Sequence, residues 1–288
     1  MGKWGDRRDG VWVNKTDSMH LFMPYLYNKR TDAEAVMVDE VDAGPLMEYV
    51  AKKNAEHPED KYTVFHAFLM VVAKTLTLRP DLNRFYKGGR LYQRDKVTLA
   101  FVAKKKFEEK SEEAMLYFKF NPTDTIHELH DRIYEKLNKI RKKGENDKTT
   151  DIIGVLCRLP RPIVYLLVRI LKILDFFGKV PYALISDDPH YSSVWVTNLG
   201  SIKLNANYHH LNNWGTNSVF AIVGEMHDEP YVDENGNVSV RKVLPYAVTL
   251  DERITDGYYC ARSVRLIKYL LSHPELLDRP AEEAVDFE

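Results

Sequence analysis

The chain has 288 residues, of which 44% are hydrophobic and 29% are charged, a composition typical of a folded globular protein rather than a disordered one. Its 41 basic and 42 acidic side chains give a formal net charge of −1. This balance argues against a dedicated nucleic-acid binder, because such proteins usually carry a basic excess.

Cysteine usage and the N-terminal residues indicate the compartment. The two cysteines, Cys157 and Cys260, are far apart and form no CxxC motif, so we expect a reducing environment and no structural zinc. The first residues contain no apolar core of a secretory signal, and Asp6 breaks the myristoylation pattern. We therefore expect a cytoplasmic protein without a metal ion.

The N-terminal half predicts an arm followed by alternating strands and helices. Residues 1–20 are polar and aromatic, typical of an arm that docks on the body. A strand is predicted over 35–41 and a short helix over 43–53. Residues 63–78 are apolar almost all round and predict a buried helix that Pro80 ends. His66 lies within it and is more typical of a core histidine than of a ligand.

The next segments contain the elements of a hairpin and a helix. Residues 90–92 and 97–103 are predicted to pair as strands after a Gly88-Gly89 turn, and residues 115–120 alternate like a further strand. A helix is predicted over 124–143. His127 and His130 lie on it at i, i+3 without a third ligand nearby, so we expect two surface histidines and no metal site.

Residues 152–185 form the most unusual segment. Its centre, residues 163–178, is as apolar as a membrane segment, but it is too short to span and charged residues interrupt it. Polar positions recur at helical spacing and give one narrow basic stripe. One interpretation is a helix packed on its own body or on a sister subunit, and the other is a helix lying in a membrane interface.

The C-terminal part alternates strands with turns and ends in a helix. Strands are predicted over 192–198 and 219–224, with a polar aromatic loop over 207–215 between them. A hairpin turn at 233–237 is flanked by strands over 238–242 and 244–250, and a helix follows over 258–271. Together these elements predict one α/β domain, an α+β two-layer sandwich with a mixed, largely antiparallel sheet, over residues 21–280, and an acidic tail over 281–288.

One short stretch joins the last strand to the last helix. It reads TLDERITDGYYCA, residues 249–261, and has four charged residues within six positions. A charged turn between a strand and a helix is a place where reactive side chains are held by a rigid frame.

Motifs in this part of the chain resemble the chloramphenicol acetyltransferase superfamily, which includes the catalytic domain of the dihydrolipoyl acyltransferases of 2-oxoacid dehydrogenase complexes. A strand, an H-x-x-x-D-G motif and an amphipathic helix ending near HPELL are its signature. Three further matches occur in the same order, RPDLNRF at 79–85, VTNLGSI at 196–202 and VFAIVG at 219–224. The resemblance covers roughly residues 20–277.

The resemblance implies a chloramphenicol acetyltransferase-like fold, a homotrimer with active sites between subunits, and coenzyme A thioester as co-substrate. In the family a histidine of HxxxDG acts as base, an aspartate orients the site, and a hydroxyl of the neighbouring subunit stabilises the oxyanion. Carried onto this chain, Thr197 supplies the hydroxyl and Asp256 the acid, with Gly257, Asn198 and Gly200 at the structural turns.

The sequence departs from the family at the position of the base, where Glu252 replaces the histidine. Proton transfer from a thiol near pKa 8.5 to a glutamate near 4.3 is uphill by about 4 pKa units, or roughly 6 kcal/mol. Burial beside Asp251 or Asp256 would raise the pKa of Glu252 and restore part of this loss. Asp256 is also a candidate to pair with Arg30, because the family's aspartate pairs with an arginine.

Two histidines offer a substitute base. His209 and His210 lie in the loop between the two strands that frame the expected site, and their other interpretation is a structural role in that loop. No lipoyl domain and no Pro/Ala-rich linker are apparent, so we expect a free-standing catalytic-type domain without a covalently bound lipoyl group. Three functions remain open: an acyl-CoA-dependent acyltransferase, a non-catalytic trimeric scaffold or ligand-binding relative, and a membrane-surface protein that uses the helix over 163–178.

Overall fold

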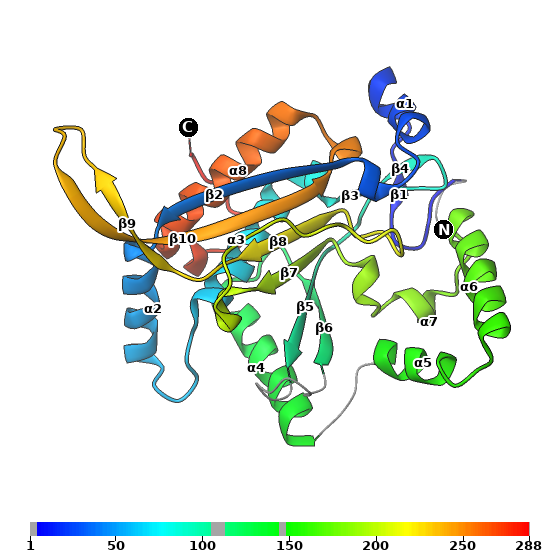
Figure 1. The fold of residues 1–288 in the computed structure, drawn as a ribbon, viewed down its shortest axis with the longest axis horizontal. Helices are drawn as coiled ribbons and strands as arrows, with labels where there is room; N and C mark the ends of the chain where they lie inside the picture. The colour runs from blue at the N-terminus through cyan, green and yellow to red at the C-terminus, as the bar shows by residue number, and fades with distance from the viewer. Residues whose placement is uncertain (1–4, 105–112, 144–147, 288) are drawn as a thin grey trace.

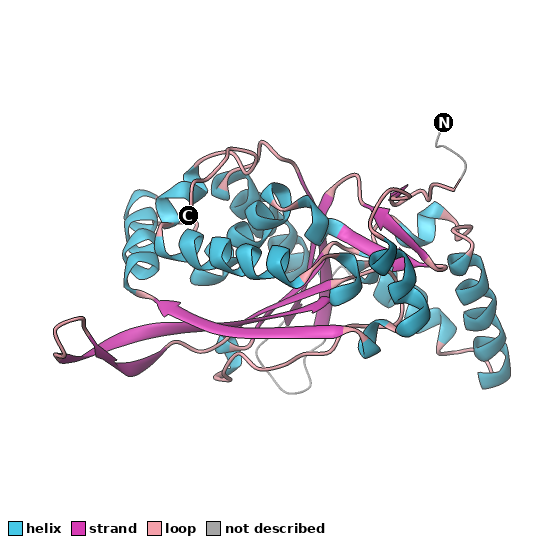
Figure 2. Cartoon of the chain, turned by 90° about the horizontal axis from the view of Figure 1, so that it is seen from above, coloured by secondary structure: helices cyan, strands magenta, loops and turns pink. Residues whose placement is uncertain are grey.

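The structure is a computed structural model that describes residues 5–104, 113–143 and 148–287. Within these ranges one large mixed sheet spans the molecule, and helices cover one of its faces (Figures 1 and 2). Its strands are β2 (Glu34–Asp42), β5 (Val97–Lys104), β6 (Glu113–Phe120), β7 (Val194–Asn198), β8 (Val219–Val223), β9 (His227–Val232) and β10 (Val238–Asp251).

The order across the sheet is β2-β10-β8-β7-β5-β6, with β9 paired to β10. The pairs β5–β7 and β7–β8 are parallel, and the other pairs are antiparallel. Long connections join the parallel strands, as such pairs require. The predicted α/β class and the mixed, largely antiparallel sheet are therefore confirmed.

The helical layer consists of α2 (Gly44–Glu56), α3 (Val64–Leu78), α4 (Ile126–Lys143) and α8 (Gly257–Ser272). Alternation along β10 explains how the sheet is covered, since Tyr246, Val248 and Leu250 enter the main core with these helices. Ala247 faces the other way and packs with Phe220 and Ile222 in a smaller cluster. The second face of the sheet thus has its own small core, which supports the site described below.

The most apolar helix, α3, is the centre of the core, as predicted. Thr63 caps it, and its hydroxyl accepts from the His66 backbone N–H while the His66 ring accepts from the Thr63 N–H. His66 is buried, and burial lowers its pKa to about 4. Its role as a core histidine is confirmed.

The expectation of two surface histidines on α4 is wrong for one of them. His130 is 2% exposed and stacks on Tyr62, with ring centroids 4.0 Å apart. His127 is partly exposed and lies 2.8 Å from the Tyr62 hydroxyl. A helix that lies in the sheet-covering layer turns one face inward, and His130 falls on that face with Leu129 and Ile133.

Two strand pairings also differ from the prediction. The strand β4 (Arg90–Gln93) pairs with β1 (Val11–Trp12) and β3 (Arg84–Lys87) in a separate small sheet, whereas β5 pairs with β6 and β7. Strand β10 runs unbroken over the two predicted strands, and its hairpin partner is β9, which the sequence pattern does not predict. The sequence of β9, HDEPYV, is mostly exposed and polar, so it lacks the alternation that marks a half-buried strand.

The unusual apolar segment forms three helices at one end of the molecule, α5 (Lys148–Leu156), α6 (Arg161–Phe176) and α7 (Tyr182–Ile185), opposite the β9–β10 hairpin (Figure 1). Asp175 is the buried residue of α6, and its carboxylate pairs with Arg7 at 2.9 Å and Lys87 at 2.5 Å. Opposite this contact, four large apolar residues of α6 are 45–58% exposed: Ile163, Leu166, Ile170 and Ile173. No helix among the described residues is long and apolar enough to cross a membrane.

The N-terminal residues pack on the small sheet through β1 and continue into α1 (Ser18–Leu26). Asp17 caps α1, and its carboxylate accepts from the backbone N–H groups of Met19 and His20. Several large apolar side chains of α1 are exposed, among them Phe22 and Tyr25. The end of α1 is joined to the charged turn after β10, because the Tyr27 carbonyl accepts a hydrogen bond from Arg253 at 2.7 Å.

Candidate functional site

The charged turn after β10 is held by a buried ion pair. Asp251, the last residue of β10, is 0% exposed and accepts two hydrogen bonds of 2.7 Å from the Arg253 guanidinium. Arg30 Nε lies 3.7 Å from the same carboxylate. Burial lowers the pKa of Arg30, and the Asp251 carboxylate opposes this effect. Asp251 therefore fixes the geometry of the turn.

Asp256 has a different role from Asp251. It is exposed and caps α8, because its carboxylate accepts from the Tyr259 N–H at 2.8 Å. Gly257 then begins the helix. The arginine considered as a partner for Asp256, Arg30, lies beside Asp251 instead.

Glu252 begins the short 3₁₀ turn η5 (Glu252–Ile254) and is partly exposed. Its backbone N–H donates to the Ala33 carbonyl at 2.8 Å. Sheet register separates it from Thr197, because Thr197 pairs with Ile222 and Ile222 pairs with Ala247, five residues before Glu252. Five strand residues span about 17 Å, so Glu252 and Thr197 of one chain do not meet.

Thr197 lies near the end of β7, on the sheet face that the main helical layer leaves open. It alternates with the core residues Val194 and Val196, so it shares its face with Trp195. Asn198 accepts from the Ser201 N–H at 3.1 Å and so closes the turn after the strand. Gly200 passes the chain beside β8, where an added Cβ would lie 2.5 Å from the Gly224 carbonyl oxygen.

A cavity of about 260 Å³ lies over this part of the sheet and brings several predicted site residues together. Thr197, His209 and His210 line it, with Asn212 and Asn217. The loop that carries the two histidines folds over the sheet, because His209 stacks on Phe220 with ring centroids 4.0 Å apart. The structure therefore joins Thr197 to the two histidines, while sheet register separates Thr197 from Glu252 of the same chain.

His190 lines the same cavity and was not singled out from the sequence. It lies in the 3₁₀ turn η3 (Pro189–Tyr191) before β7, and the Asp188 carboxylate accepts from its backbone N–H at 3.0 Å. The same carboxylate oxygen lies 2.9 Å from His190 Nδ1. A carboxylate at Nδ1 holds the proton there and leaves Nε2 as the acceptor, which is the arrangement of a general base.

The signal for His190 in the sequence is weak. Asp188, Pro189 and His190 form an ordinary turn sequence, and the turn places the aspartate beside the histidine ring. The approach of His190 to Thr197 depends on the path of the chain through η3 into β7, which local sequence does not determine.

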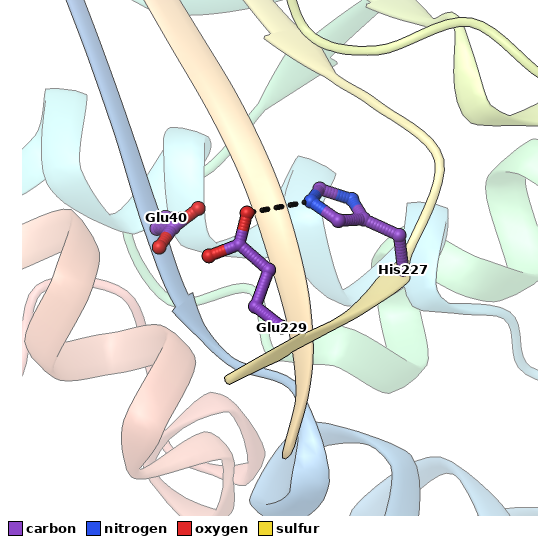
Figure 3. A group of neighbouring side chains, drawn as sticks. All are labelled: Glu40, His227 and Glu229. Carbon is purple, nitrogen blue, oxygen red and sulfur yellow. Dashed lines mark hydrogen bonds and ion pairs between the residues drawn. The ribbon is translucent and has the colours of Figure 1, made fainter. Parts of the chain in front are cut away.

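A second group of ligating side chains lies on the other edge of the sheet (Figure 3). His227 and Glu229 of β9 and Glu40 of β2 have ligand atoms within 4.8 Å of one another, the arrangement of a group able to hold a metal ion. His227 Nε2 lies 3.0 Å from a Glu229 carboxylate oxygen, and this hydrogen bond raises the pKa of His227. Burial and the neighbouring Glu229 raise the pKa of Glu40. These residues are far from β7 in the sheet order.

Comparison with known proteins gives one family and a common fold. Residues 183–278 match the model of the 2-oxoacid dehydrogenases acyltransferase catalytic domain. No curated protein matches the chain.

Three solved structures are similar over most of their length. A probable dihydrolipoamide acetyltransferase from Listeria monocytogenes is 16% identical, with TM-score 0.59, over 99% of this chain and 100% of that one. The cubic core of the pyruvate dehydrogenase multienzyme complex is 15% identical, with TM-score 0.60, over 93% and 94%. A chloramphenicol acetyltransferase is 11% identical, with TM-score 0.50, over 90% and 96%.

At these identities the structures show a shared fold, and the family match covers the segment that contains η3, β7 and the charged turn. The resemblance seen in the sequence is thus confirmed: the chain has the chloramphenicol acetyltransferase-like fold, and its residues 183–278 match the catalytic domain of the 2-oxoacid dehydrogenase acyltransferases.

Proposed function

We propose that this protein transfers an acyl group between a thioester, of coenzyme A or of a lipoyl group, and a small acceptor. The observation that supports the proposal is the cavity on the open sheet face, which gathers Thr197 with His190, His209 and His210. A hydroxyl and an oriented imidazole on one cavity wall are the groups that acyl transfer requires.

His190 is the proposed base. Histidine is in general a stronger base toward a thiol, with an ordinary pKa of about 8.5, than glutamate is, because the ordinary pKa of imidazole is about 6.5 and that of a glutamate carboxyl is about 4.3. This general difference favours an imidazole over a carboxylate as the base by roughly 3 kcal/mol. Asp188 is a positioning residue, since it holds the proton on Nδ1 and stabilises the imidazolium that forms.

The steps follow from this placement. His190 Nε2 removes the proton of the attacking thiol or hydroxyl, and the resulting anion adds to the thioester carbonyl carbon. The Thr197 hydroxyl donates a hydrogen bond to the carbonyl oxygen as it becomes negative. When the intermediate collapses, the carbon–sulfur bond breaks, and the proton on His190 passes to the leaving thiolate.

We also propose a homotrimer in which a neighbouring subunit brings its Glu252 and Asp256 to the Thr197 side of the cavity. The separation of about 17 Å within one chain supports a role between subunits if Glu252 acts at this site. In that arrangement Glu252 is a second candidate base, and His209 and His210 are candidates to contact the acceptor.

The test is release of the coenzyme A thiol from acyl-CoA over a panel of acceptors. His190→Gln is expected to lower kcat by about 10² to 10⁴-fold, the usual contribution of a general base. His57→Gln, an exposed histidine outside the cavity, is the matched control and is expected to keep the wild-type rate.

The variants Glu252→Gln and Glu252→His separate the candidate bases. If Glu252→Gln abolishes a real rate and His190→Gln does not, the glutamate of a neighbouring subunit is the base. If the wild type is inert with every acceptor and Glu252→His gains activity, the protein is the non-catalytic scaffold or ligand-binding relative, and the acyltransferase proposal is wrong.

A second role, contact with a membrane surface, is supported by α6. Its exposed apolar face, Ile163, Leu166, Ile170 and Ile173, lies beside the basic residues Arg161, Arg169 and Lys172 of the same helix. Such a helix lies in the plane of an interface that contains anionic lipid. Vesicles of phosphatidylcholine and phosphatidylserine should co-sediment the wild type and not Leu166→Glu/Ile170→Glu, and equal sedimentation of both would rule the contact out.

A further inference from the structure

A second cavity, of about 250 Å³, lies among the helices α5, α6 and α7. Eight of its lining residues are aliphatic, including Leu156 of α5, Leu171 of α6 and Leu184 of α7. The side chains packed around this end form only a small cluster of Val180, Ile185 and Tyr191. An apolar cavity beside so small a core is suited to an apolar ligand.

Helical geometry explains why α6 contributes to this cavity with one face only. Val168 and Leu171 are three residues apart and less exposed than their neighbours, and both line the cavity. Asp175, one turn further on the same face, anchors α6 through Arg7 and Lys87. The ion pairs therefore hold the cavity-lining face of α6 toward the body.

The apolar cavity adjoins the proposed active site. His190 lines both cavities, and its partner Asp188 lines the apolar one. Trp214, from the loop that carries His209 and His210, also lines the apolar cavity. The polar residues thus come from η3, from Asp188 just before it and from that loop, while every aliphatic lining residue except Val180 comes from the three helices. A ligand that extends from the Thr197 cavity past His190 enters aliphatic surroundings.

We propose that this cavity binds the acyl chain of the substrate, so that the protein acts on thioesters of medium-length aliphatic acids in preference to acetyl thioesters. The inference rests on the proposed acyl-transfer function and adds the class of acyl group. The size of the cavity is consistent with a medium-length acyl chain. A dry apolar cavity of roughly 150 Å³ holds benzene, and at the same volume per carbon the 250 Å³ of this cavity admits about ten carbon atoms.

The acyl pocket also accounts for the unusual apolar sequence of 152–185. A segment that only packed on the body would bury its aliphatic side chains, yet Ile152, Ile153 and Leu184 line the cavity while 39–44% exposed. They lie where the cavity meets solvent, as side chains at the rim of a ligand pocket do.

The first measurement compares octanoyl-CoA with acetyl-CoA. Each methylene buried in the cavity should strengthen binding about four-fold, so kcat/KM for octanoyl-CoA should exceed that for acetyl-CoA by on the order of 100-fold or more. A measurable rate that does not depend on chain length would overturn the acyl pocket and leave the acyl-transfer function standing.

Two adjacent residues of α5 provide a matched pair of variants. Leu156→Trp fills the cavity and is expected to lower the octanoyl-to-acetyl ratio of kcat/KM by at least about 10-fold. Val155 is 62% exposed and does not line the cavity, so Val155→Trp should keep the wild-type ratio. Leu184→Trp is a second filling variant at the rim, should Leu156→Trp not fold. An unchanged ratio in a folded filling variant contradicts the proposal.

Binding measurements with the two thioesters test the acyl pocket independently of the acyl-transfer function. If the wild type turns over neither thioester, the acyl-transfer proposal fails, and calorimetric titration of both thioesters decides the pocket alone. Tighter binding of octanoyl-CoA than of acetyl-CoA, lost in Leu156→Trp and kept in Val155→Trp, supports it. Equal binding of the two thioesters overturns it.

Discussion

Asp251 and Asp256 lie in one turn and have opposite environments. Asp251 is buried against Arg253 and near Arg30, whereas Asp256 is exposed at the start of α8. The family resemblance placed the orienting acid at Asp256, and this assignment stays a prediction. The carboxylate that organises the turn in the folded chain is Asp251, because it is the one that two arginines face.

Replacing these two residues should therefore have unequal effects. Asp251→Ala leaves Arg253 buried without its partner and is expected to lower the free energy of unfolding by about 3 to 5 kcal/mol. Asp256→Asn keeps a good helix cap and is expected to change the free energy of unfolding by less than about 0.5 kcal/mol. Urea unfolding of both variants measures the difference, and equal losses would contradict the assignment.

The pH dependence of stability should reflect His66. Its pKa falls from 6.5 to about 4 on folding, so between these values the unfolded chain binds a proton that the folded chain does not. Stability from this group is complete above pH 6.5 and is lost as pH falls toward 4, by up to roughly 3 kcal/mol.

The variant His66→Gln tests this expectation. Glutamine keeps the acceptor of the capping box with Thr63 and does not titrate. Unfolding free energies of His66→Gln should fall less steeply from pH 6.5 to 4 than those of the wild type. Identical slopes would show that His66 does not carry the effect.

At the scale of elements, local sequence predicts α6 as a helix, but a contact between distant segments fixes where it packs. The apolar run predicted the helix, and a single buried carboxylate fixes its position, since Asp175 pairs with Arg7 of the N-terminal segment and Lys87 of β3. Burial lowers the pKa of Lys87, and the Asp175 carboxylate opposes this effect. Arg7 and Lys87 come from separate parts of the chain, so no local sequence pattern indicates their contact with Asp175.

Removing Asp175 should loosen the helical end of the molecule. Asp175→Ala is expected to destabilise the protein by about 3 kcal/mol, because the buried Arg7 and the partly buried Lys87 lose a partner, although Arg7 keeps Asp9 at 2.8 Å. Amide exchange in α5 and α6 should rise more than in α3. Glu275→Gln, an exposed carboxylate on another helix, is the control, and a variant as stable as the control would contradict this role.

At the scale of the whole molecule, the sheet face opposite the main helical layer carries the cavity of the proposed site. The main helical layer covers one face of the sheet (Figure 2). The loop with His209 and His210 covers part of the other face, where His209 stacks on Phe220. Exposed apolar side chains of α1 and α6 add to the surface that remains. Such apolar surface on a folded chain is typical of contacts between subunits or with a membrane.

We expect light scattering to show a particle of three times the 33.5 kDa chain mass, as the family resemblance implies. Mixing two inactive variants then locates the site. Because His190 and Thr197 line one cavity of one chain, His190→Gln mixed with Thr197→Ala should regain no activity beyond the sum of the two. Recovery of activity in the mixture would contradict a site in which His190 and Thr197 of one chain act together. A monomer at micromolar concentration would contradict the trimer.

Sequence alone determined most of the elements and a resemblance to the superfamily. Periodicity predicted α3, α8, β2, β7 and β8, since their apolar side chains repeat with the period of a helix or fit a buried strand, and the ordered motifs at 196–202 and 219–224 indicated the superfamily. It missed β9, whose side chains are mostly exposed, and misplaced the partner of β4, because pairing depends on contacts between distant segments.

Only the tertiary structure decided which side chains meet. Glu252 and Thr197, linked by family pattern, are separated by sheet register, while His190, which has no motif of its own, is brought to Thr197 by the path of the chain into β7. The apolar run of 152–185 specified helices, and only their packing shows a cavity beside His190. The physical reason is that local periodicity records which residues leave water, whereas a site is made by the distances between segments far apart in sequence.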